Sequence, residues 1–196
     1  MSVEENKNEK RGKLLEAAHA LFTNNGAIKP PTIDEVVELA GVAKGTFYLY
    51  FKDKYDLMDQ LFLKKISECV SSALETTRQR LENRDVTDIQ RVNTFLDEVF
   101  RFIENNKAFL PLVRDRAPSC YRLMIRGKDS DIKEAYDGLI QIFLQHGYTE
   151  HESEMNIYML VSMLVPISCE SAIYSVPYTL EEIKTGVQQL TAKLLA

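Results

Sequence analysis

Residues 32–57 read TIDEVVELAGVAKGTFYLYFKDKYDL, and this stretch decides the fold. Thr32, followed three residues later by Glu35, forms a capping box that predicts the start of a helix. Apolar residues then recur at steps of three and four until Gly41, which predicts a tight turn. A short helix is predicted over residues 43–50. The stretch is therefore predicted to fold as helix, three-residue turn and helix.

The rest of the chain is also predicted to be helical, because no strand-like alternation or repeat interrupts its helical periodicity. We expect an all-α fold of about nine helices, with a three-helix helix-turn-helix domain at residues 1–53 and a second helical domain at residues 54–196. The helices expected outside the opening stretch cover residues 11–24, 53–81, 87–105, 107–114, 118–147 with a break near 127–129, 151–175 and 179–195. The capping-box pattern recurs at Thr87 with Gln90, Thr149 with Glu152 and Thr179 with Glu182, and it predicts the starts of three of these helices.

The charge of the chain is uneven. Its formal net charge is −5, and an acidic protein is a poor default partner for nucleic acid. Residues 1–54, however, contain eight Lys and Arg and eight Asp and Glu, so the remainder carries the whole deficit. Basic residues cluster on both sides of the turn, at 7–13 and 44–54. Such clusters are also common on plain solvated surfaces, so the charge permits a nucleic-acid partner without requiring one.

The opening stretch closely resembles the DNA-binding signature of the TetR family of bacterial regulators. The shared features are the N-cap Thr32, the A-G-V turn at 40–42, the K-G-T-F-Y-x-Y-F segment at 44–51 and the K-x-K-x-x-L segment at 52–57, in the family's order and spacing. The motif resemblance covers residues 11–57, and beyond it only helical layout and length agree. It implies a sequence-specific transcriptional regulator that binds a double-stranded DNA operator as a homodimer, a repressor released by a small-molecule effector.

The short helix is predicted to offer one face and bury the other. Lys44 and Tyr48 lie at i and i+4, where they suit base edges and phosphates of a major groove, while Phe47 and Phe51 are predicted core residues. Tyr50 is expected to be partly core, and Thr32 alternatively serves only as a cap. The resemblance implies DNA contacts at Thr32, Lys44, Gly45, Thr46, Tyr48, Tyr50 and Lys54, with Ala43 beside them.

Ala43 departs from the family pattern, which often has a hydroxyl residue at this helix start. The change gives up a cap worth about 1 kcal/mol and one phosphate contact. We interpret it as a change of operator preference or affinity.

The resemblance also implies an effector pocket and a dimer interface in the second domain. Aromatic residues and methionines are the pocket candidates, with plain core as the alternative, and the last two helices are expected to pair with those of a second copy. The pocket candidates are Phe95, Val99, Phe102, Phe109, Tyr121, Met124, Tyr136, Phe143, Tyr158 and Met159. The interface candidates are Met155, Ser162, Met163, Ile173 and Leu190. Pro166 frees a backbone carbonyl within the first of these two helices, which either bends the helix or serves a ligand.

Several other classes of protein are disfavoured. Cys69, Cys120 and Cys169 are widely spaced and fit reduced, buried thiols. The three histidines lack metal-ligand spacing, and no nucleophile elbow or phosphate loop appears, so we predict no catalytic residues, metal or cofactor. The apolar stretch 159–169 is too short to span a membrane, and the polar start has no signal-peptide core, so a cytoplasmic location is expected. The alternatives to a regulator are an enzyme on a helical scaffold and a helical adaptor that has lost DNA binding.

Overall fold

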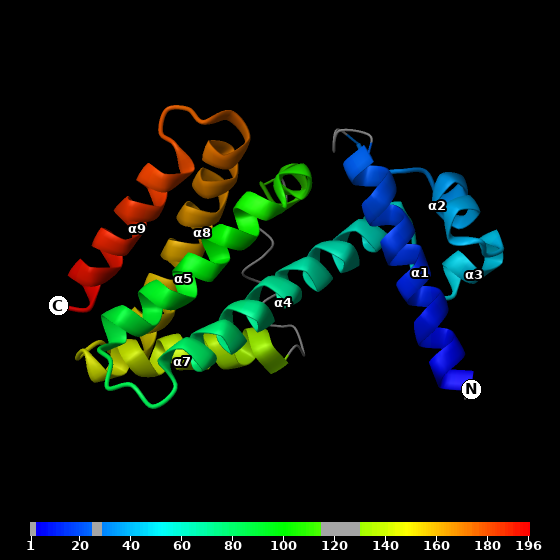
Figure 1. Ribbon diagram of the computed structural model, residues 1–196. Helices are drawn as coiled ribbons and strands as arrows, with labels where there is room; N and C mark the ends of the chain where they lie inside the picture. The colour runs from blue at the N-terminus through cyan, green and yellow to red at the C-terminus, as the bar shows by residue number, and fades with distance from the viewer. Residues whose placement is uncertain (1–2, 25–28, 115–129) are drawn as a thin grey trace. The chain divides into compact units, whose positions relative to one another are not determined.

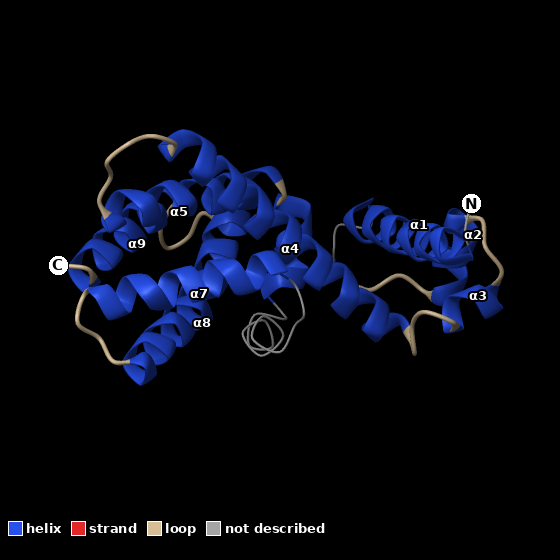
Figure 2. Ribbon diagram, turned by 90° about the horizontal axis from the view of Figure 1, so that it is seen from below, coloured by secondary structure: helices blue, strands red, loops and turns tan. Residues whose placement is uncertain are grey.

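The computed structural model describes residues 3–24, 29–114 and 130–196, and every regular element in these ranges is a helix (Figures 1 and 2). The predicted all-α class is confirmed. The chain divides into two compact units, Met1–Lys65 and Ile66–Ala196. The division falls inside one helix, whereas the predicted domain boundary precedes that helix at residues 53 and 54. That predicted folding boundary stays a prediction.

The first unit contains α1 (Val3–Asn24), α2 (Ile33–Ala40), α3 (Lys44–Tyr48) and the start of α4 (Lys54–Leu81). Helix α1 packs against α2 and α3, which also contact each other. The predicted start of α1 at residue 11 was wrong, because apolar periodicity begins only at Leu14. The polar Glu and Lys residues before it extend the helix through their own helix propensity.

Helices α2 and α3 form the predicted helix-turn-helix layout. Gly41 ends α2 in the left-handed conformation, with a φ of 64°, and its N–H donates to the carbonyls of Glu38 and Val37. A residue with a Cβ rarely adopts this conformation, so the glycine allows the sharp turn. Val42 N–H also donates to the Val37 carbonyl at 3.1 Å, and α3 begins two residues later.

The second unit contains the end of α4 and α5 (Asp88–Asn105), the short 3-10 helix η1 (Lys107–Phe109), α7 (Ser130–Gln145), α8 (Glu150–Tyr174) and α9 (Leu180–Leu194). Helices α5, α8 and α9 pack against one another, and α7 packs against α8 (Figure 1). The predicted helix 107–114 begins as η1 and continues as an α-helix over 110–114. Of the predicted segment 118–147, residues 118–129 lie outside the described residues.

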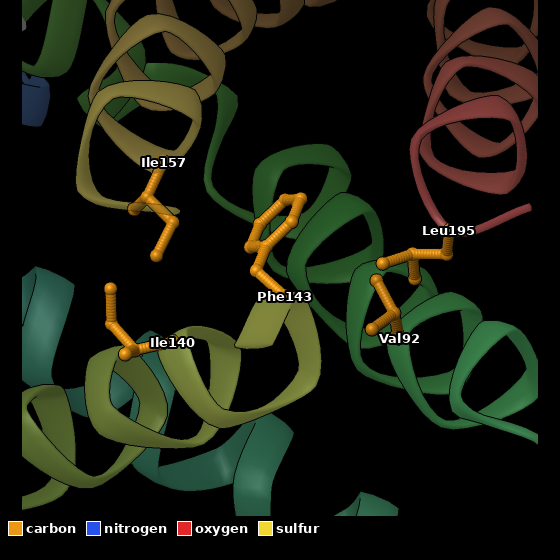
Figure 3. Close-up of a cluster of buried hydrophobic side chains, with 5 residues drawn as sticks. All are labelled: Val92, Ile140, Phe143, Ile157 and Leu195. Carbon is orange, nitrogen blue, oxygen red and sulfur yellow. The ribbon is translucent and has the colours of Figure 1, made fainter. Parts of the chain in front are cut away.

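One apolar cluster joins the helices of the second unit. Val92 of α5, Phe143 of α7 and Ile157 of α8 converge within it, together with Ile140 and Leu195 (Figure 3). The Phe143 ring meets the Tyr148 ring edge-on at 5.3 Å. The Tyr148 hydroxyl in turn donates to the Leu194 carbonyl at 2.8 Å, so the cluster holds the end of α9 against α7.

Four helices begin with a capping box, as the sequence predicted for each of them. The N-cap threonines are Thr32, Thr87, Thr149 and Thr179, and their partners three residues later are Glu35, Gln90, Glu152 and Glu182. At Glu152 the pKa is lowered, first by the hydrogen bond from the Thr149 backbone N–H and then by that from its hydroxyl. The folded state therefore favours the ionised glutamate.

These boxes predict a specific acid sensitivity. A lowered folded-state pKa contributes stability that is present above the ordinary pKa of glutamate and is lost as the pH falls through the folded value. Glu152→Gln should therefore reduce the drop in melting temperature between pH 7 and about pH 3.5. Gln90→Glu should enlarge it, because it adds an ionisable partner to a neutral box. Circular dichroism melts of both variants measure the effect, and equal drops in the two variants would contradict it.

Candidate nucleic-acid interface and cavity

Helix α3 is held by aromatic residues on one face and is open on the other. Phe47 is completely buried, and its ring lies 5.4 Å from that of the buried Phe51. Tyr48 is 55% exposed and meets the Phe47 ring edge-on. The predicted core positions of Phe47 and Phe51 are confirmed. The outward face of α3 is made by Lys44, Gly45 and Tyr48, which are all exposed.

Gly45 is not required by packing within the chain. A Cβ built at this position meets no other atom within 4 Å. Glycine in a helix costs about 0.5–1 kcal/mol relative to alanine, so the protein carries this cost without a steric need of its own. The absent side chain instead leaves α3 open to close approach from outside.

The Lys44 ammonium does not point freely into solvent. Its Nζ lies 2.6 Å from Oδ1 of Asp34 on α2, and both side chains are largely exposed. The hydrogen bond and charge of Asp34 raise the pKa of Lys44. The pairing of Asp34 with Lys44 was not predicted from the sequence. The two residues are ten positions apart across a turn, and the helical i,i+4 rule applies only to residues within one helix.

The other predicted DNA contacts surround this pair. The Thr32 hydroxyl donates to Glu35 at 2.7 Å and accepts the Glu35 N–H at 3.3 Å, so it acts as a cap. Ala43 has extended N-cap backbone but makes no side-chain hydrogen bond, in line with the missing hydroxyl. Thr32, Ala43, Lys44, Gly45 and Tyr48 are exposed, whereas Thr46, Tyr50 and Lys54 are half-buried. All eight lie within the first unit.

A cavity of about 1010 Å³ lies between α4, α5 and α7 in the second unit. This volume is at the upper end of the roughly 300–1,000 Å³ typical of small-molecule sites. Its lining combines seven apolar residues with nine polar or charged residues and Gly138, and of the ten pocket candidates from the sequence it includes Phe95. The apolar lining residues are Leu74, Leu81, Val92, Phe95, Ala135, Leu139 and Ile142.

The charged groups of the cavity are mostly paired. Arg78 forms an ion pair with Glu134, and Lys133 with Asp137 at 2.9 Å. Arg91, in the first turns of α5, lines the cavity without an ion pair to any described residue. Among the described cations of the lining, Arg91 is therefore the one that is available to an incoming anion.

The remaining pocket candidates lie elsewhere. Phe109 and Phe143 are buried in packing, and Val99, Phe102 and Tyr136 are half-buried away from the cavity lining. Tyr158 and Met159, expected in the pocket, are instead exposed on α8. Tyr121 and Met124 lie outside the described residues. The candidates were chosen mainly because they are aromatic residues or methionines. Such residues occur in the core, in pockets and on the surface, so this criterion does not identify a pocket.

Helix α8 carries an exposed apolar face. Met155, Met159, Met163 and Ile167 recur every fourth residue, and all are more than two-fifths exposed. Of the interface candidates, Met155, Met163 and Leu190 are exposed, and Ser162 and Ile173 are half-buried.

The same helix corrects the sequence argument on membranes, which considered only residues 159–169. Among the described residues, α8 is the helix that is long and apolar enough to cross a membrane, and 28% of its apolar stretch is buried. Length and composition alone are weak grounds for a span, because core helices of soluble proteins meet the same criteria.

The described cysteines are unreactive. Cys69 and Cys169 are free and buried, and burial raises the pKa of each thiol to about 12. The predicted buried thiols are confirmed for these two, and Cys120 lies outside the described residues. Within the described ranges, no group of three His, Cys, Asp or Glu is placed to hold a metal.

The anchored short helix, its exposed basic and aromatic face and the preceding capped helix form a helix-turn-helix unit, a layout that DNA-binding proteins use. Residues 14–61 match the family model described as bacterial regulatory proteins, tetR family. This part of the chain is thus similar to the DNA-binding region of TetR-family regulators.

The relatives agree with this assignment. The chain is 41% identical over 73 residues to the uncharacterized HTH-type transcriptional regulator YhgD of Bacillus subtilis, covering 36% of this chain and 38% of that protein. It is 30% identical over 100 residues to the transcriptional activator FasR of Mycolicibacterium smegmatis, covering 51% and 43%. The chain thus spans about two-fifths of the length of these curated relatives.

The whole fold matches solved structures. A crystal structure of the transcriptional regulator FadR from Bacillus subtilis, in complex with stearoyl-CoA, aligns with a TM-score of 0.58 over 94% of this chain and 97% of that one. At 16% identity this likeness defines the fold.

Proposed function

We propose that the chain is a sequence-specific DNA-binding transcriptional regulator, a repressor that a small-molecule effector releases from its operator. The observation that carries the proposal is the outward face of α3 within the family-matched region, where Lys44, Gly45 and Tyr48 are exposed while Phe47 is buried. The helical adaptor is less favoured, because the relatives are named as regulators. FasR is named an activator, so the sign of regulation needs a reporter assay.

In the proposed interface, α3 contacts the edges of the DNA bases. Contacts to the phosphate backbone of the DNA on either side of α3 position the protein. Lys44 supplies a charged donor and Tyr48 a planar ring with a hydroxyl tip, which suit base edges and phosphates of a major groove about 12 Å wide. The missing side chain of Gly45 permits close approach. The helix dipoles at the starts of α2 and α4, near Thr32 and Lys54, favour phosphate oxygens.

We further propose that α8 and α9 pair with those of a second copy. One short reading helix contacts too few base pairs to be selective, so such modules work as dimers on half-sites about 34 Å apart. The exposed methionine face of α8 would lose its contact with water in this pairing. A second copy, rather than lipid, then covers the apolar stretch, and the protein acts in the cytoplasm where DNA is accessible.

For the effector we propose an amphipathic acid derivative, such as a long-chain acyl thioester, in the cavity between α4, α5 and α7. The apolar part of the lining suits an alkyl chain, and Arg91, which has no ion pair to a described residue, suits an anionic head. The structural relative FadR was crystallised with stearoyl-CoA, which has this chemistry. Coupling of about 1–3 kcal/mol between effector and operator would change DNA affinity by roughly 5-fold to 150-fold.

Three substitutions on α3 test the DNA-binding proposal. Lys44→Ala and Tyr48→Ala should each weaken binding to an operator fragment by about tenfold or more, and Lys44→Ala should also lower the salt dependence of binding. Gly45→Ala should weaken binding although it stabilises the helix by about 0.5–1 kcal/mol. Gel shifts at several salt concentrations and thermal melts measure these effects, using fragments selected from genomic DNA.

Gly12→Ala is the matched control, because Gly12 is also helical and a Cβ there meets nothing within 4 Å. It should stabilise the protein without weakening DNA binding. If the wild-type chain gives no salt-sensitive shift with any selected fragment, the regulator proposal fails.

A charge on the exposed face of α8 tests the dimer. Met163→Glu should convert the dimer into a monomer and abolish operator binding, because an unpaired carboxylate in an apolar interface is strongly unfavourable. Leu144→Glu, on an exposed part of α7, is the control and should stay dimeric. Analytical ultracentrifugation without detergent measures both variants. A wild-type chain that is monomeric, or soluble only in detergent, contradicts the proposed pairing.

The effector proposal is tested with stearoyl-CoA. Excess stearoyl-CoA should raise the melting temperature of the wild-type protein and weaken its gel shift, whereas free CoA should do neither. Arg91→Gln should weaken stearoyl-CoA binding by about tenfold, the effect of losing one charge-assisted hydrogen bond of about 1.4 kcal/mol. Arg84→Gln removes an exposed arginine outside the cavity lining and should bind normally. Equal binding by both variants would rule out Arg91 as the anion contact.

A further inference from the structure

We propose that Asp34 is an autoinhibitory residue of the DNA interface, which holds the Lys44 ammonium in the free protein and competes with DNA phosphate for it. The proposal rests on the DNA-binding function proposed above and adds a residue that opposes binding. Removal of the Asp34 charge is therefore expected to tighten binding to any duplex.

The geometry places Asp34 inside the proposed interface. Its Oδ1 lies 2.6 Å from Nζ of Lys44, and it stands two residues after Thr32 at the start of α2. The side chains of Asp34 and Lys44 are 74% and 52% exposed, so a DNA backbone reaches both. No rearrangement of the fold is needed for the exchange of partners, because Lys44 is a flexible side chain on the open face of α3.

The electrostatic argument follows from the number of charges. In the free protein one ammonium faces one carboxylate. When DNA binds, a phosphate joins them, so two anions share a single cation at short range. The repulsion between carboxylate and phosphate opposes binding, and it weakens as salt screens exposed charges over about 10 Å at 0.1 M. Because an exposed ion pair is itself weak, this repulsion is the main part of the effect.

A purely structural role for Asp34 predicts a different outcome. Acidic residues in the first turn stabilise a helix through its dipole, and α2 has both Asp34 and Glu35 there. If Asp34 acted only in this way, neutralising it would loosen α2 and leave DNA binding unchanged or weaker. Tighter binding separates autoinhibition from a role in helix stability.

The first readout needs no DNA. Lys44 should be acetylated slowly by acetic anhydride in the wild-type chain, because its ion pair favours the charged, unreactive form. Asp34→Asn should accelerate acetylation at Lys44 relative to Lys52 in the same molecule, and Asp34→Glu should restore slow labelling. Mass spectrometry of peptides measures the ratio. An unchanged ratio in Asp34→Asn means that the pair does not form, which overturns the proposal.

The second readout is duplex binding. Asp34→Asn should bind a labelled random-sequence duplex and a selected operator fragment about fivefold more tightly than wild type at low salt, with the gain shrinking as salt rises. Glu38→Gln is the matched control, since Glu38 is an exposed carboxylate on α2 without an ion pair to any described residue. It removes the same charge and should give a smaller gain. The Asp34→Asn gain should also vanish in a Lys44→Ala background.

The outcomes separate the two proposals. Binding by Asp34→Asn that equals Glu38→Gln or falls below wild type overturns autoinhibition, while wild-type binding still supports a DNA-binding regulator. If no variant binds any duplex although Lys44 labelling responds to Asp34, both the regulator function and autoinhibition fail. A duplex shift that is stronger in Asp34→Asn than in both wild type and Glu38→Gln supports autoinhibition.

Discussion

Burial of Phe47 is the interaction on which the proposed interface depends. Helix α3 has five residues, far below the roughly 12–15 that an isolated helix needs to be stable in water, so packing rather than propensity holds it. Phe47, fully buried beside Phe51, supplies that packing. The same contact fixes the rotation of the helix, because residues on the opposite side must then point outward. Phe47, which is buried away from the proposed interface, thereby determines which side chains of α3 face the DNA.

Helix α8 shows why burial within one copy of a chain is an incomplete account of its stability. Its capping box and length make it well formed, yet a stripe of methionine and isoleucine stays exposed along it. Exposed apolar area of this kind is unfavourable in water at about 25 cal/mol per Å². Association that covers this face of α8 would therefore stabilise the second unit. Association of two identical copies would also supply the two α3 helices that a two-half-site operator requires.

Features set by neighbouring residues were predicted from the sequence, and features set by tertiary packing were not. The four capping boxes and the turn at Gly41 depend on contacts within a few residues, and all were predicted. The Asp34–Lys44 pair depends on how two helices meet, so no local rule finds it. The cavity depends on which faces of three helices turn toward one another. Its lining mixes aliphatic with charged residues, while Tyr158 and Met159 are exposed, because apolar periodicity does not separate core, pocket and interface.

Lys44 and Arg91 illustrate two ways in which a protein prepares a cation for an anion. Arg91 has no ion-pair partner among the described residues and is exposed beside apolar side chains, so it attracts an anionic head without a prior exchange of partners. Lys44 has a carboxylate partner at 2.6 Å in open solvent, and this carboxylate repels an approaching anion, so binding requires several further contacts that offset the repulsion. A duplex held by a dimer supplies such contacts, whereas a free phosphate ion does not. The paired lysine therefore favours binding to an extended, highly charged surface over binding to small anions in general.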